Sequence, residues 1–199
     1  MTNVLHLVHS VDPTNGGVAE AVNRLNDEMN SLGLDSTVSD NRDYKLKEPF
    51  FIIAHGLWQW PSIEAYHVFR KYKIPYLLFP HGMLDPWFKR TYRLKHIKKQ
   101  IYWWLRQGKA VRNAKALCFT TEEERALAQK TFWPYSCKEI VTGLGVQNSP
   151  NNSAEQCETF LSEYPKLRYK KVLLYLGRFH PKKGVDLLIN SFSRKSSKD

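Results

Sequence analysis

Residues 50–79 read FFIIAHGLWQWPSIEAYHVFRKYKIPYLLF, which is two apolar runs separated by a segment of helical length. Both runs, residues 50–54 and 75–79, are short, continuous and rich in Phe, Ile and Leu, as is typical of strands covered on both faces. Between them, Pro61 suits the first position of a helix. This order predicts a parallel β–α–β unit.

The same alternation continues on both sides of this unit. Further strands are expected at residues 4–8, 36–38, 116–119 and 138–141, and helices at 17–32, 92–108 and 122–130. Residues 40–49 are too few for a crossover helix, so we expect an irregular connection there. The pattern predicts an α/β fold, with a Rossmann-like parallel sheet that has helices on both faces.

A polar, turn-forming stretch, NSPNNS at residues 148–153, divides the sequence. Beyond it, KVLLYL at 171–176 predicts a strand, and a helix follows from about Gly184. We therefore expect an N-terminal domain at 1–147, a linker at 148–170, and one βα unit at 171–199 that is the truncated start of a second domain.

Composition narrows the class of protein. The 199 residues are 42% hydrophobic, which excludes a disordered chain, and the net charge of +11 favours anionic partners. The three cysteines, Cys118, Cys137 and Cys157, match no metal-binding spacing, so we expect small buried or idle thiols in a reducing compartment. Without an apolar span of about 18 residues or a signal peptide, we expect a soluble, cytoplasmic protein.

Most of the positive charge falls on one segment. Residues 86–121 contain no Asp or Glu but ten Lys and Arg, interleaved with aromatic residues. Such a helix suits peripheral attachment to an anionic membrane, here the inner membrane surface. The alternative is a surface helix whose aromatic residues belong to the core. Nucleic acid is not expected as a partner because no recognition motif is present.

Candidate ligand-binding residues follow the predicted strands, where parallel sheets bind ligands. Gly16 and Gly17 precede a helix N-terminus that suits a phosphate or a sugar hydroxyl, although an ordinary tight turn is the alternative. His55 follows one strand, and His81 with Gly82 follows the next. Their imidazoles can donate a hydrogen bond or exchange a proton near neutral pH, and a structural role is the alternative.

Two further segments carry charged residues. In GRFHPKKG, Arg178 and Lys183 can neutralise a leaving diphosphate, and Gly184 permits a close approach; a solvated charge run is the alternative. In TTEEE at 120–124, a threonine followed three residues later by a glutamate predicts a capping box rather than a catalytic site.

Five motifs together resemble a known family. They are GGVAE (16–20), PHGMLDPW (80–87), AKAL leading into TTEE (114–123), GLGV (143–146), and GR with KG (177–184). In order and spacing, they resemble the N-terminal half of a family 4 glycosyltransferase of the GT-B fold, over nearly the whole chain.

The resemblance implies two Rossmann-like domains that face each other across a cleft. The N-terminal domain would bind a glycan or lipid-linked acceptor, and the C-terminal domain a nucleotide-sugar donor. Transfer would retain the anomeric configuration without a cofactor or metal. Arg178 and Lys183 would stabilise the leaving diphosphate, Gly17 would approach the donor phosphates, and His81 would line the sugar cleft.

The chain departs from the family in one respect. The family's Glu-x7-Glu pair is absent, because only Asp186 and Asp199 are acidic after Lys183. We therefore expect an incomplete half of a polysaccharide- or glycolipid-forming enzyme, inactive unless the missing half is supplied in trans. The alternatives are a non-catalytic remnant, an acceptor-binding module, or a basic peripheral membrane protein.

Overall fold

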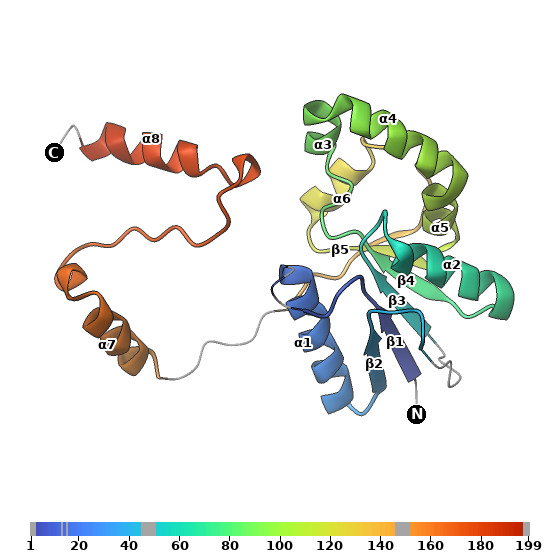
Figure 1. The fold of residues 1–199 in the computed structure, drawn as a ribbon, viewed down its shortest axis with the longest axis horizontal. Helices are drawn as coiled ribbons and strands as arrows, with labels where there is room; N and C mark the ends of the chain where they lie inside the picture. Colours follow the sequence, from blue (N-terminus) through green and yellow to red (C-terminus); the bar gives the residue numbers. More distant parts are fainter. Residues whose placement is uncertain (1–2, 13, 15, 45–50, 146–151, 197–199) are drawn as a thin grey trace. The chain divides into compact units, whose positions relative to one another are not determined.

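A parallel sheet organises the first part of the chain in the computed structural model (Figure 1). The structure describes residues 3–12, 14, 16–44, 51–145 and 152–196. Within them the strands are β1 (Asn3–Leu7), β2 (Asp35–Ser39), β3 (Phe51–His55), β4 (Tyr76–Phe79), β5 (Ala116–Phe119) and β6 (Glu139–Val141). All pairs of neighbouring strands are parallel, in the order β2-β1-β3-β4-β5-β6. The predicted Rossmann-like α/β fold is therefore confirmed.

Helices cover both faces of this sheet (Figure 1). The helices of this part are α1 (Gly17–Ser31), α2 (Trp60–Tyr72), α3 (Pro86–Thr91), α4 (Arg93–Tyr102), α5 (Gly108–Asn113) and α6 (Glu122–Ala128). Because strand residues alternate between faces, Val4 and Ile53 pack with Met29 of α1. Leu5 and Ile52 face the side that α2 and α5 cover.

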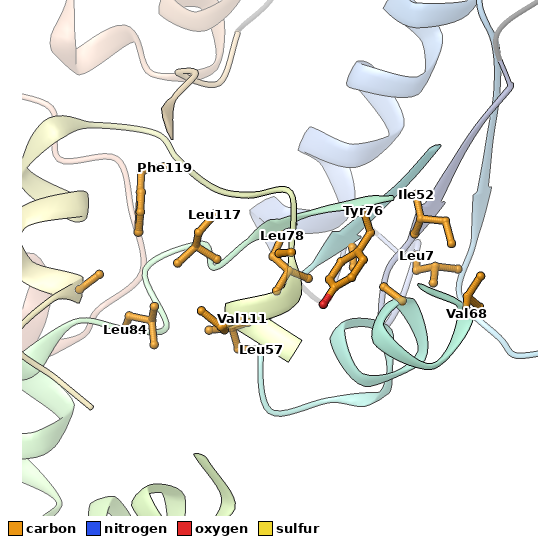
Figure 2. Close-up of a cluster of buried hydrophobic side chains, with 14 of the residues drawn as sticks. Leu7, Ile52, Leu57, Val68, Tyr76, Leu78, Leu84, Val111, Leu117 and Phe119 are labelled. Carbon is orange, nitrogen blue, oxygen red and sulfur yellow. The ribbon is translucent and has the colours of Figure 1, made fainter. Parts of the chain in front are cut away.

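The larger core lies on the α2 and α5 side of the sheet (Figure 2). Leu7, Leu78 and Leu117 come from three strands and are fully buried there, and they pack with Val68 of α2 and Val111 of α5. The hydroxyl of Tyr76 donates a hydrogen bond to the carbonyl of Ala110. This continuous apolar layer fixes the sheet on which the candidate site is built.

The helix predicted at residues 92–108 differs in its details. Tyr92 has φ −126° and ψ 65°, which separates α3 from α4. Asp85 caps α3 and accepts a hydrogen bond from the backbone N–H of Trp87 at 2.7 Å. After α4, the chain continues through a π-helical turn, Trp103–Gln107, into α5.

The chain divides into two compact units, residues 1–146 and 147–199. In the second unit, the strand predicted at 171–176 is wrong, because these residues adopt neither strand nor helix and their side chains are mostly exposed. A strand needs a neighbour to pair its backbone, and the described part of this unit contains none.

The second unit is helical where its residues are described. Its helices are α7 (Ser153–Glu163), α8 (Val185–Ser196) and the 3-10 turns Pro165–Leu167 and Pro181–Lys183. α7 thus lies within the segment expected to be a linker, while the start of that linker, residues 148–151, falls outside the described residues.

Candidate functional site

The candidate site lies where the strand order reverses. β1 pairs with β2 on one side and with β3 on the other, so successive crossovers leave β1 in opposite directions. Since β1, β3 and β4 are parallel, their carboxyl ends share one edge of the sheet (Figure 1). Open α/β sheets bind ligands at this edge, at such a switch point.

Three histidines form a chain of hydrogen bonds from within the sheet to this edge. His6 lies in β1, His55 ends β3, and His81 lies two residues beyond β4. His6 Nδ1 is 3.0 Å from His55 Nε2, and His55 Nδ1 is 3.1 Å from His81 Nε2. Sequence reasoning singled out His55 and His81 but missed His6. The sequence did offer one signal for His6. It is a polar residue within an apolar strand, two positions after Val4 and so on the same face of the sheet.

Burial keeps these histidines neutral at pH 7. His6 is completely buried and His55 is 2% exposed. Burial lowers the pKa of His6 to about 4 and that of His81 to about 4, although the nearby Glu124 carboxylate opposes the shift at His81. Burial and the two neighbouring imidazoles also lower the pKa of His55. His55 is thus a neutral, buried ring, and both of its nitrogens are occupied by hydrogen bonds to His6 and His81.

His81 sits in a backbone conformation that costs energy. The backbone N–H of Met83 donates to the carbonyl of Pro80 at 3.0 Å and closes a tight turn. The central residues, His81 and Gly82, have φ of 47° and 74°, as a type I′ turn requires. The left-handed region costs a non-glycine residue about 1–2 kcal/mol. Such strain is concentrated at functional sites, which favours a functional role for His81.

Glu124 of α6 holds this turn in place. One carboxylate oxygen accepts a hydrogen bond from the N–H of Gly82 at 2.7 Å. The other accepts from the N–H and hydroxyl of Thr120, at 2.9 and 2.7 Å. Thr121 caps the helix by accepting from the N–H of Glu124 at 3.1 Å, which is one half of the predicted capping box. The Glu124 carboxylate binds Thr120 instead of the N-cap Thr121. The cap of α6 thereby also positions the loop that carries His81.

The glycine pair leaves open space at the start of α1. Gly16 has φ 120° and precedes α1. Apart from the adjoining residues and the backbone of α1, no heavy atom of the described residues lies within 4 Å of where a Cβ would stand on Gly16 or Gly17. No side chain among the described residues caps this helix start. Its N–H groups are thus placed to bind a ligand oxygen. Asn15, the residue before this glycine pair, lies outside the described residues.

The remaining predicted site residues belong to the second unit. Arg178 and Lys183 are exposed, and Gly184 has φ 65° where it follows the 3-10 turn Pro181–Lys183. His180 caps this turn through Nδ1, which accepts a hydrogen bond from the N–H of Lys182 at 3.2 Å. The segment is therefore a defined turn that presents basic side chains to solvent.

The basic helix exposes apolar side chains. Leu94, Ile97 and Ile101 of α4 are 78%, 56% and 47% exposed and recur at helical spacing. Trp103 is buried, but Trp104 is half exposed. The alternative that the aromatic residues are core thus holds for Trp103 and not for Trp104. α3, α4 and residues 131–132 line a cavity of about 270 Å³. Lys99 of α4 is one of the lining residues, and its Nζ lies 4.7 Å from the ring centre of Trp58.

Among the described residues, no cluster of His, Cys, Asp or Glu is arranged to hold a metal ion. The three histidines form a line rather than a convergent set. Neither a scan against protein-family models nor a search of curated proteins finds a match to the chain.

Proposed function

We propose that the first unit is the acceptor-side domain of a retaining glycosyltransferase. It would take a sugar from a nucleotide-sugar donor to a glycan or lipid-linked acceptor in polysaccharide or glycolipid synthesis. The observation that carries the proposal is a neutral histidine, His81, held in a strained turn at the switch-point edge of the sheet. Its family basis is the resemblance of the PHGML and glycine-pair motifs.

The geometry of the first unit supports the roles proposed for His81 and the glycine pair, and the resemblance alone suggests the role of Arg178 and Lys183 in the second unit. A neutral imidazole at His81 forms hydrogen bonds with sugar oxygens and does not compete for phosphate as a cation would. The open start of α1 at Gly16 and Gly17 suits a donor phosphate. Arg178 and Lys183 would neutralise the diphosphate as it leaves. The proposal calls on no metal or cofactor.

Ligand-observed NMR on the 199-residue chain tests this proposal. We expect saturation transfer to oligosaccharides or glycolipid head groups from a panel, because the acceptor edge lies within the first unit. His81→Ala should abolish that transfer. His67→Ala, which removes an exposed imidazole from α2, is the matched control and should leave it unchanged.

The proposal fails if no carbohydrate in the panel receives saturation from the wild-type chain. It also fails if the two histidine variants weaken the signal equally, because the ligand would then not lie at the switch-point edge.

A second candidate function, attachment to an anionic membrane surface, is favoured by α4. Its exposed stripe of Leu94, Ile97 and Ile101 lies on a helix whose Arg93 and Lys98 are also exposed. An apolar stripe bordered by cations suits the interface of an anionic bilayer. No helix in the described parts of the chain has the length and apolar character needed to cross a membrane.

Vesicle sedimentation tests this attachment. Each Lys or Arg near an anionic surface contributes about 1 kcal/mol, so Arg93→Glu with Lys98→Glu should weaken binding to phosphatidylglycerol vesicles at least ~30-fold. Lys166→Glu with Lys170→Glu makes the same charge change on exposed residues of the second unit and should have a smaller effect. Equal binding to neutral and anionic vesicles would rule out the candidate.

A further inference from the structure

The three histidine rings are arranged edge to edge. The ring centres of His6 and His55 are 5.3 Å apart with an interplanar angle of 18°, and those of His55 and His81 are 5.3 Å apart at 23°. With nitrogen–nitrogen distances of 3.0 and 3.1 Å, such spacing places each pair of rings nearly in one plane. In this geometry the N–H of one imidazole points at the lone pair of the next.

The number of ring protons limits how the three histidines can be protonated. Each of the two hydrogen bonds holds one proton, whichever ring carries it. Three neutral imidazoles carry three ring protons in all. The third proton therefore sits at one of the two ends, either on His6 Nε2 or on His81 Nδ1. Its position fixes the tautomer of all three rings at once.

The two ends of the chain are unlike. His6 Nε2 is buried and has no hydrogen-bond partner among the described residues. A proton there would create a buried N–H without an acceptor, which native proteins rarely contain. At the other end, His81 is only partly buried, so a proton on its Nδ1 is not enclosed in the core as one on His6 Nε2 would be. This difference between the two ends favours the third proton on His81 Nδ1.

We infer that His6 and His55 are positioning residues that hold His81 as its Nδ1–H tautomer, through the two hydrogen bonds His6 Nδ1–H to His55 Nε2 and His55 Nδ1–H to His81 Nε2. The edge of the sheet then presents one neutral N–H donor. His81 cannot accept a proton from a ligand hydroxyl, because its other nitrogen is occupied by His55. It recognises a ligand oxygen that accepts a hydrogen bond.

The identity of that ligand rests on the proposed function, in which the oxygen belongs to a sugar. The proton arrangement does not rest on it. The Nδ1–H form is also the minor tautomer of free histidine. We therefore expect all three histidines to adopt it only because these hydrogen bonds hold them in it. The inference is therefore readable in the protein without any ligand.

Histidine ring 15N NMR on the full chain at pH 7 tests the inference, because protonated and bare ring nitrogens give well-separated shifts. We expect the Nδ1–H pattern for His6, His55 and His81. His6→Leu removes the donor to His55, so His55 and His81 should gain Nε2–H populations. His6→Asn keeps a donor amide near the place of Nδ1, so both should retain the Nδ1–H pattern.

Three results would overturn the inference: an Nε2–H or charged His81 in the wild-type chain, an unchanged His81 pattern in a folded His6→Leu variant, or loss of the Nδ1–H pattern in His6→Asn. If His6→Leu does not fold, the wild-type spectrum and His6→Asn still decide. If the protein shows the expected tautomers but binds no carbohydrate, the proposed function is refuted and the inference about the tautomers stands.

Discussion

At the level of single residues, His6 and His81 bind protons differently from a histidine in an unfolded chain. Their pKa values are lowered by burial to about 4, from 6.5. As the pH falls below 6.5, the unfolded chain takes up protons that the folded chain does not. The free energy of unfolding should then fall by about 1.4 kcal/mol per pH unit for each such histidine, until the pH approaches 4. Above pH 6.5 these groups add no pH dependence.

Urea unfolding at pH 7, 6 and 5 checks this prediction, with His6→Asn as the comparison. The variant lacks one of the groups that titrate, so its unfolding free energy should fall less steeply with decreasing pH, by about 1.4 kcal/mol per unit. The test compares how the unfolding free energy of the two proteins changes with pH, and a difference in their stability at pH 7 does not affect it. Identical slopes for the two proteins would show that His6 is not kept neutral by burial.

Sequence reasoning found part of the site for a clear physical reason. His55 and His81 each follow an apolar run that ends at a ligand-binding edge, so their position alone draws attention. His6 lies inside such a run and looks like an interruption of it. Its role depends on the pairing of β1 with β3 and on the ring geometry, which only the tertiary structure supplies. The hydrogen bond from Gly82 to Glu124 was likewise out of reach, since 42 residues separate the partners.

At the level of elements, the π-helical turn before α5 depends on Gly108. A Cβ on Gly108 would lie 2.7 Å from the carbonyl oxygen of Trp103 and 3.0 Å from its Nε1. That nitrogen donates to the carbonyl of Pro134 at 2.9 Å, so the ring cannot move freely. In an ordinary helix, alanine would be favoured over glycine by about 1 kcal/mol. Here the clash should outweigh that gain.

We therefore expect Gly108→Ala to destabilise the first unit by about 1–3 kcal/mol. Gly17→Ala is the matched control, because it also replaces a helical glycine and, beyond the adjoining residues and the backbone of α1, no heavy atom of the described residues lies within 4 Å of the new Cβ. Its effect should stay within about 0.5 kcal/mol. Thermal unfolding of both variants measures the difference. A Gly108→Ala variant as stable as the wild type would mean that the π-helical turn is not fixed by Trp103.

Elements were predictable where a local pattern dictated them. The strands β3 and β4 are continuous apolar runs, and a parallel sheet requires such runs. The same reasoning failed at residues 171–176, because an apolar run forms a strand only beside a partner. The break at Tyr92 and the π-helical turn follow from packing rather than from helical periodicity, so the sequence showed one long helix.

At the level of the whole molecule, the two units differ in how much they bury. Both hydrophobic clusters lie within the first unit, whereas no described side chain of the second unit is buried. A chain that ends at Val146 should therefore keep the cooperative unfolding transition of the full protein. The separate segment 147–199 should show no such transition.

Differential scanning calorimetry on the three chains checks this prediction. The midpoint for residues 1–146 should match that of the full chain within a few degrees. Loss of the transition on removal of residues 147–199 would instead show that the second unit completes the core of the first.

The central claim is that a sugar binds at the switch-point edge, next to His81. Mapping amide shifts on the 199-residue chain during titration with the oligosaccharide that binds best tests it most directly. The account predicts that the amides of Gly17 and Gly82 shift, while that of Gly33, at the far end of α1, does not. Shifts confined to the cavity lined by α3, α4 and residues 131–132, or the absence of shifts at Gly82, would contradict it.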